Sequence, residues 1–481
     1  MIIHPAWATK YKKKGTELRL IKGRYYLYEV SSKWDAEKKR SKKITGKLLG
    51  KITESDGFIE SDKAKLRKRE MSISHVSVKE YGVSAFLDSQ LCEYTTLLQN
   101  YFPEHWQIII ALAYGRFVHH SPLKNMEYHY LQSYLSVLYP NLPLSPKSLT
   151  GIMRDIGARR MNITQFFKEF SKADDNILFD GTDLLTDSKK MELPHTGKSK
   201  KGTFESLANT MFIFSVGLQL PIYYRLLPGN IKDIKAFKLC LEESQISDAV
   251  VIADKGFFSH ENIQRMETEQ LKFIIPLHRN NSRISYDIIQ SADKQHFDGF
   301  FKYEGRIIWY YQIQVYNHTV CVFLDEERKT QEIKDYLDRI EKLPEKYTSE
   351  NFLNKQYIFG TIALLHNLEK SPQEIYVDYK SRGQIETMID TLKNILDADR
   401  SYMQNEQALE AWMFINFIAL QWYYKICRIL AEKGLTPTHT PMDLILFLKG
   451  IRKVKINETW YTAEMTKKTA ALLNTLNIHI T

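Results

Sequence analysis

The spacing of hydrophobic and polar residues changes several times along this 481-residue chain. Residues 17–52 combine apolar and aromatic positions with a charged turn, which predicts a basic β-hairpin. From about residue 77 to 170, apolar residues recur at helical spacing. Within that region, Ser145 and Pro146 form a helix start signal and Gly157 is a plausible stop. This segment could be the second helix of a helix-turn-helix or simply a short capped helix.

The pattern changes at Asn176 to short apolar strands that are separated or followed by helical segments. Strands with crossover helices indicate an α/β sheet. Four more strand candidates follow within 272–323, and then a long charged helix. Helical spacing returns at 372–396 and 406–432. The first group of strands is expected at 177–180, 209–217, 221–227 and 249–254.

Composition excludes several classes of protein. With 43% hydrophobic and 12% aromatic residues, the chain can bury large cores and is not disordered. The longest apolar stretches, near 108–113 and 411–424, fall short of the roughly 20 residues that a membrane helix needs. The first residues contain no apolar segment typical of a signal peptide. The four scattered cysteines show no zinc spacing and are expected to be reduced, which favours a cytosolic location.

The positive charge of the chain is concentrated at its start. The whole chain has 67 Lys and Arg against 57 Asp and Glu, a net charge of +10. Residues 1–50 hold 14 of the basic and 4 of the acidic residues, so the excess lies there and the remainder is neutral. A basic arm on a neutral body suggests a polyanionic partner such as nucleic acid, or else a solubilising tail.

Two aspartates stand where α/β enzymes place catalytic groups. Asp180 and Asp254 each close a predicted strand, and strand ends in such sheets open into the ligand crevice. Either residue alone could instead cap the following turn. Asp183 and Asp187 follow closely, so one of them could replace Asp180 as the first acid.

A third acid lies on the helix expected at 372–396. At helical spacing, Arg382, Glu386 and Lys393 form a stripe along the edge of the apolar face, with Tyr379 roughly alongside. The alternative is a solvated face with an Arg–Glu pair worth about 0.2–0.5 kcal/mol. The apolar face itself comprises Ile385, Met388, Leu392 and Leu396.

Three converging carboxylates without a His or Cys ligand set suit Mg²⁺ or Mn²⁺. Two such ions, roughly 3.5–4 Å apart, can activate a water or a 3′-hydroxyl and stabilise the leaving oxygen in phosphodiester cleavage. This chemistry agrees with a basic protein that acts on DNA.

The sequence resembles the DDE transposases of bacterial insertion sequences, in the group defined by a Y-x2-R-x3-E-x6-K signature and a ribonuclease-H-like core. FDGT at Asp180 resembles the first-Asp motif of this family, and ADKGF at Asp254 resembles the second. LPGNIKD at 227–233 resembles the segment usually found between them. The signature positions are matched by Tyr379, Arg382, Glu386 and Lys393.

The resemblance implies roles for individual residues. Asp180, Asp254 and Glu386 would be the catalytic, metal-binding triad for two Mg²⁺ ions, with Mn²⁺ as a substitute. Tyr379, Arg382 and Lys393 would contact DNA phosphates near the transposon end. Family members can place a Trp of the insertion domain beside the cleaved end, and Trp309 is the candidate here, against the more common role of a core aromatic in a strand.

The expected fold is α/β, with a ribonuclease-H-like mixed sheet core and a β-rich insertion, preceded by a basic β segment and a helical DNA-binding region. The expected divisions are a basic hairpin arm and linker (1–75), a helical DNA-binding domain (76–172), the first segment of the catalytic core (173–270), a β-rich insertion domain (271–350), the second segment of the core with the signature helix (351–400) and a C-terminal helical region (401–481).

The expected function is DNA transposition by Mg²⁺-dependent phosphodiester hydrolysis and strand transfer at the terminal repeats of the element. The expected partners are double-stranded DNA of the transposon ends and the target, and a second copy of the chain in a dimeric synaptic complex. No membrane is involved, and the expected location is the bacterial cytoplasm at the nucleoid. Two alternatives remain at this point: a Mg²⁺-dependent nuclease or resolvase without strand transfer, and a non-catalytic, domesticated DNA-binding protein.

Overall fold

The structure is a computed structural model in which the chain divides into two compact units. One unit comprises Met1–Lys79 with Arg452–Glu464, and the other comprises Glu80–Ile451 with Met465–Thr481. Some residues of the charged turn after residue 35 and of the LPGNIKD segment lie outside the described residues. The described residues are 4–35, 40–66, 76–172, 175–198, 204–229, 233–246, 249–291 and 293–480.

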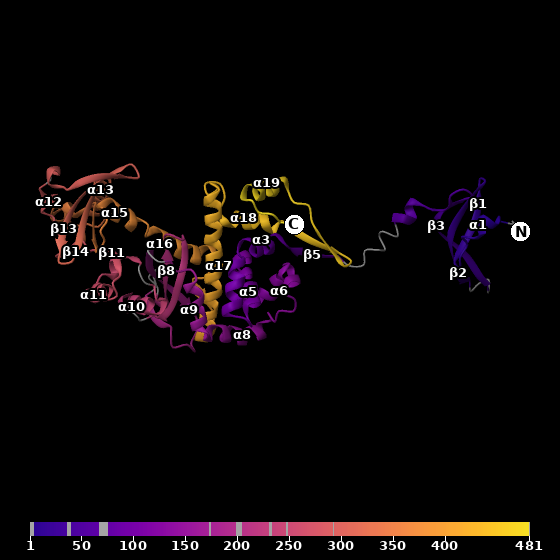
Figure 1. The fold of residues 1–481 in the computed structure, drawn as a ribbon, viewed down its shortest axis with the longest axis horizontal. Coiled ribbons are helices and arrows are strands. Elements are labelled where there is room, and N and C mark those ends of the chain that lie inside the picture. Colours follow the sequence, from indigo (N-terminus) through magenta and orange to yellow (C-terminus); the bar gives the residue numbers. More distant parts are fainter. Residues whose placement is uncertain are drawn as a thin grey trace. The chain divides into compact units, whose positions relative to one another are not determined.

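The first unit contains a four-stranded antiparallel sheet in the order β1-β2-β3-β4 (Figure 1). The expected hairpin is present as β2 and β3. The arm and linker expected over 1–75 also contain a strand that the sequence did not predict, since β4 pairs antiparallel with β3. The strands are β1 (Thr16–Ile21), β2 (Arg24–Asp35), β3 (Arg40–Thr53) and β4 (Gly57–Glu60).

A second, smaller sheet joins distant segments of the chain. Its order is β18-β17-β5, so β5 (Val76–Glu80) pairs with a hairpin of β17 (Arg452–Ile456) and β18 (Thr459–Thr462). The C-terminal region therefore contains strands as well as the expected helices, which include α18 (Pro441–Lys449) and α19 (Lys467–Leu476).

The helical region from α3 to α9 packs around α17 (Glu406–Glu432), a helix that is buried along most of its length (Figure 1). Ser145 caps α8 as predicted, since its side chain accepts from the Ser148 amide. Gly157 does not end α8: it lies within the last turn, where a Cβ would come 1.7 Å from the Gln407 carbonyl oxygen. The helices are α3 (Gly82–Gln90), α4 (Cys92–Tyr101), α5 (Trp106–His119), α6 (Met126–Gln132), α7 (Leu135–Leu138), α8 (Pro146–Ala158) and α9 (Arg160–Lys168).

A large mixed sheet forms the remainder of the second unit. Its middle has the order β9-β8-β6-β10-β11; β8 is antiparallel to β6 and β9, whereas β10 and β11 run parallel to β6. The expected α/β class with a mixed sheet is confirmed. The elements are β6 (Asn176–Thr186), β7 (His195–Lys198), β8 (Phe204–Ser215), β9 (Leu220–Pro228), α10 (Asp233–Ser244), β10 (Val250–Ala253), α11 (His260–Thr268) and β11 (Lys272–Pro276).

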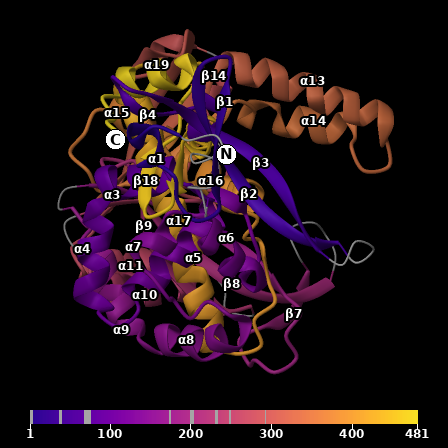
Figure 2. The ribbon, with the colours of Figure 1, turned by 90° about the vertical axis from the view of Figure 1, so that its right-hand side faces the viewer.

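The strands expected in an insertion continue this same sheet. β15 pairs antiparallel with β11, and β14, β13 and β12 follow in antiparallel order. Two helices beside these strands, α13 and α14, lie side by side (Figure 2). The elements are β12 (Gly299–Tyr303), β13 (Arg306–Val315), β14 (His318–Asp325), α13 (Glu326–Lys342), α14 (Ser349–Lys355) and β15 (Thr361–His366).

The four cysteines are free thiols, as the sequence predicted. Across the described helices, none combines the length and apolar character needed to cross a bilayer.

Candidate active site

The register between β6 and β10 brings the two candidate aspartates together. The parallel ladder ends at the pair of Phe179 with Ala253, so Asp180 and Asp254 follow at matching positions on neighbouring strands. The expectation that the strand stops at Asp180 is wrong, because β6 continues to Thr186 through its pairing with β8. What ends at this point is β10.

Along one edge of β6, the pairing with β10 ends at Phe179. β16 (Arg400–Ser401) joins this edge at Leu185 and Thr186. Asp180 thus lies in a gap between two described strands, where its side chain is 20% exposed. The Gly181 amide donates to Asp180 Oδ1 over 2.8 Å and helps to fix the carboxylate.

The alternation of side chains along β6 separates Asp180 from the two acids that follow. Asp183 is three residues further along the same strand, so its side chain projects from the opposite face. Asp187 forms an ion pair of 3.6 Å with Arg400. Asp180 is therefore the member of the three that lies beside Asp254.

Glu386 comes from a helix that is less regular than the sequence predicted. The single helix expected over 372–396 is wrong: α15 (Pro372–Lys380) ends, the chain turns at Ser381 and Arg382, and α16 (Gly383–Asp390) begins. A π-helical turn, η5 (Thr391–Ile395), follows. The predicted apolar face is buried nonetheless, with exposures of 0–2% at Ile385, Met388, Leu392 and Leu396.

The break places Arg382 between the three acids. Its Nη1 lies 3.9 Å from Asp180 Oδ2 and 3.9 Å from Asp254 Oδ1, and its Nη2 pairs with Glu386. Burial lowers the pKa of Arg382, but Asp254, Tyr379, Glu386 and Asp180 outweigh burial and raise it overall. We refer to Asp180, Asp254, Glu386 and Arg382 as the acid site.

A cavity of about 670 Å³ opens beside the acid site and is lined by Asp254, Arg382 and Glu386. Tyr379 also lines it, and burial raises the pKa of this phenol although Arg382 opposes the shift. Sequence reasoning missed the other charged residues of the cavity, which come from four separate segments. These are Lys255, Arg279, Arg328, Glu332 and Lys380. Two of them lie inside quoted motifs, Lys255 in ADKGF and Lys380 between Tyr379 and Arg382, but at positions to which no role was given.

Two of the predicted DNA contacts lie apart from this cavity. Trp309 on β13 packs against Phe297 and Phe300, with the Lys294 ammonium 5.1 Å from its ring centre. Lys393 is half-buried on the π turn. Lys393 is not among the residues that line the cavity.

The donor set of the acid site fits a hard divalent cation. Three carboxylates surround one positive group, and neither His nor Cys takes part. The carboxylates are spread around the guanidinium and do not form a tight ligand set. Among the described residues, one group of possible metal ligands has all its ligand atoms within 4.8 Å of one another: Glu104, His105 and Asp155. Arg159 already donates to both acids of that group.

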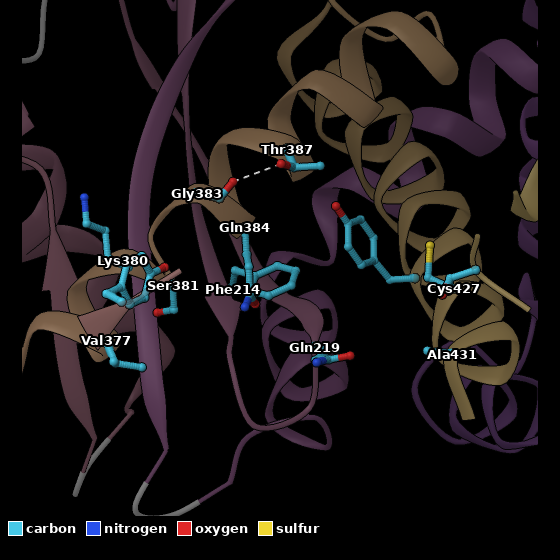
Figure 3. A pocket seen from close by; sticks show the side chains of 13 residues that line it. Phe214, Gln219, Val377, Lys380, Ser381, Gly383, Gln384, Thr387, Cys427 and Ala431 are labelled. Carbon is cyan, nitrogen blue, oxygen red and sulfur yellow. Dashed lines mark hydrogen bonds between the residues drawn. The ribbon is translucent and has the colours of Figure 1, made fainter. Parts of the chain in front are cut away.

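A second cavity, of about 600 Å³, lies between α15 and α16 on one side and the end of α17 on the other (Figure 3). Gly383 lines both cavities. Burial raises the pKa of the Cys427 thiol in this second cavity to about 12, so the thiol is protonated and is a poor nucleophile.

Comparison with protein families settles the class of the chain. Residues 178–422, a span that contains all three acids, match the family described as "Transposase DDE domain". The chain belongs to this transposase family. Transposases of this family process nucleic acid and use divalent metal ions, so the expectations of a DDE transposase and a metal-dependent enzyme are confirmed at this level.

The chain was also compared with solved structures and with proteins of curated function. This transposase-family chain is similar to the protein in the "Cryo-EM structure of piggyBac transposase synaptic complex with hairpin DNA", with 10% identity, a TM-score of 0.40, and coverage of 77% of this chain and 80% of that one. No protein of curated function matches the chain.

Proposed function

We propose that this chain is a DNA transposase of the Tyr-Arg-Glu-Lys signature group of bacterial insertion sequences. The observation that carries the proposal is the convergence of Asp180, Asp254 and Glu386 on Arg382, a residue of the signature itself. The strand order β9-β8-β6-β10-β11, with β8 alone antiparallel, supports a ribonuclease-H-like core.

In this proposal the three acids hold two Mg²⁺ or Mn²⁺ ions. A bound divalent cation supplies Lewis acidity and neutralises developing charge in phosphodiester hydrolysis and transfer. Asp180 and Asp254 are held by neighbouring strands, while Glu386 lies in the first turn of α16 next to the break. The guanidinium of Arg382 and the phenol of Tyr379 are placed at the cavity wall, where both can donate hydrogen bonds to phosphate oxygens.

Lys393 and Trp309 keep their proposed roles as a phosphate contact and as an aromatic beside the cleaved end. The half-buried ring of Trp309, flanked by Phe300 and Lys294, has the composition of a surface that stacks on a base. We propose that both residues approach DNA in the synaptic complex, which a homodimer would form around two transposon ends.

The basic arm is proposed to grip DNA. Residues 31–34 of β2 and the facing residues 40–47 of β3 are exposed, and Lys33 lies directly opposite Lys42. Facing lysines repel each other, and a polyanion relieves that repulsion. A two-stranded ribbon also fits the major groove of DNA. We further propose that the chain follows the division expected from the sequence, with a helical DNA-binding domain over 76–172.

The test uses DNA fragments from both sides of the gene. Each fragment contains one end of the element and is labelled there. With Mg²⁺, the wild type should cut at the element's ends and join the freed ends to a second duplex, whereas Asp254→Ala should do neither. Cutting without joining would favour a nuclease or resolvase. Binding without cutting, in wild type and variant alike, would overturn the catalytic proposal.

A further inference from the structure

Lys380 is a half-buried cation beside the acid site, at an unspecified position of the signature between Tyr379 and Arg382. It is the last residue of α15, two positions before Arg382, and its side chain lines both cavities. In Figure 3 it is drawn with its ammonium group directed away from Gln384 and Cys427. The ammonium lies 4.9 Å from the centre of the buried Tyr376 ring. Across the described residues of the chain, no carboxylate comes within ion-pair distance of it.

The acids whose charges act on Lys380 are Asp325 and Glu304, and both already pair with Arg306. Arg306 pairs with Asp325 at 2.6 Å. Arg279 and Arg328 both pair with Glu332, at 2.8 and 3.0 Å. Lys380 therefore remains uncompensated within a group of cations.

The electrostatic surroundings agree with this geometry. Burial lowers the pKa of Lys380, and the charges of Arg328 and Arg306 lower it further, against a smaller opposing effect of Asp325 and Glu304. A half-buried ammonium without a counterion is costly, and a bound anion would remove the cost.

We propose that Lys380, together with Arg328, binds a backbone phosphate of the DNA strand that reaches the acid site. Both side chains line the cavity that also contains Asp254 and Glu386, so a strand at the carboxylates passes them. A phosphodiester is the anion that suits this position, because it is singly charged and accepts from ammonium and guanidinium donors. This inference rests on the proposed function.

The first experiment maps the contact directly. The full-length protein is treated with an amine-acylating reagent, with and without a short mixed-sequence DNA duplex in Ca²⁺, and acylation is measured by mass spectrometry. DNA should protect Lys380 several-fold and leave Lys334, an exposed lysine of α13 outside the cavity, unchanged. Equal acylation of Lys380 with and without bound DNA would overturn the inference.

The second experiment compares matched charge-removing variants. Lys380→Gln should weaken binding of a duplex end and lower the slope of log affinity against log salt by about 1, as expected for one lost phosphate contact. Lys380→Arg should restore the slope, and Lys334→Gln should leave it unchanged. If wild type binds and cuts DNA but Lys380→Gln behaves like Lys334→Gln, the inference fails while the proposed function stands. If the wild type neither binds nor cuts, the proposed function fails first.

Discussion

The acid site and the basic β2–β3 ribbon have opposite charge and very different structural support. Asp180 and Asp254 follow Phe179 and Ala253, which are both fully buried in the large core of the second unit. The ribbon extends from a sheet whose buried core comprises four residues, Ala8, Leu18, Leu27 and Ile52. Phosphodiester chemistry needs groups held in a fixed geometry, whereas phosphate contacts tolerate movement. Under the proposed function, we therefore expect the second unit to set the reaction rate and the ribbon to contribute to DNA affinity.

The largest effect is expected from removing one charge of the acid site. Asp180→Asn should lower the rate of DNA cleavage about a thousandfold, because a lost metal ligand removes several kcal/mol of transition-state stabilisation. Affinity for DNA should be unchanged or slightly higher, and both are measured with a labelled duplex.

Asp183→Asn is the matched control, since it makes the same change on the opposite face of β6. It should keep cleavage within a few-fold of wild type. An equal loss of cleavage rate in both variants would show that the effect comes from disturbing β6 and not from losing the Asp180 carboxylate.

The next effect concerns the stability of the body. Gly157→Ala places a Cβ against the Gln407 carbonyl, so it should lower the free energy of unfolding of the second unit by about 3 kcal/mol. Gly151→Ala, on the same helix, meets no atom within 4 Å and should raise stability by up to about 1 kcal/mol. Denaturant unfolding measures both, and equal effects at the two glycines would contradict the packing of α8 on α17.

A pH effect is expected from an ion cluster in the same body. Burial would raise the pKa of Glu243, but Arg160, Tyr223 and Arg225 outweigh burial and lower it to about 2. The folded form therefore binds the proton less readily than the unfolded form. The resulting stability, about 3 kcal/mol, is present above the ordinary pKa of 4.5 and is lost as the pH falls towards 2.

Glu243→Gln should remove this contribution to the acid dependence. The variant should be less stable than wild type at neutral pH, and the difference should shrink as the pH falls through this range. Thermal unfolding at a series of pH values measures it. A constant difference across the range would contradict the assigned ion pairs.

The smallest effect is expected from the arm. Lys33→Gln and Lys42→Gln should each weaken DNA binding and lower the salt slope by about 1, while cleavage at saturating DNA stays the same. Lys425, which pairs with Glu93 in the body, provides a control position. A loss of cleavage rate at saturating DNA would show that the arm does more than bind.

The sequence predicted most strands of the large sheet, the α17 helix and the buried face around Ile385, because each depends on local spacing. It missed β4, β5, β17 and β18, and it singled out the three acids through motifs that resemble those of the family. It could not predict the register that places Asp180 beside Asp254, since register depends on which residues of two distant strands pair. Nor did it predict the break at Ser381 and Arg382, which contains no proline and lies directly before Gly383.

The cavity beside the acid site could not be predicted from the sequence either. Arg279, Arg328 and Lys380 belong to segments that only the sheet brings together, and charged positions on α13 look like an ordinary solvated face. Whether a cation has a counterion can be judged only once its neighbours in space are known. Lys380 is such a case, because the acids that act on it, Asp325 and Glu304, both pair with Arg306.

The central claim, that Asp180, Asp254 and Glu386 together hold the metal, is tested most directly by iron-mediated cleavage of the protein chain. Fe²⁺ replaces Mg²⁺, and ascorbate with peroxide then cuts the backbone next to the bound ion. The account predicts fragments that end near all three acids, suppressed by excess Mg²⁺ and absent in Asp254→Asn. Fragments that end instead near Glu104 and Asp155, or cuts that Asp254→Asn leaves unchanged, would contradict it.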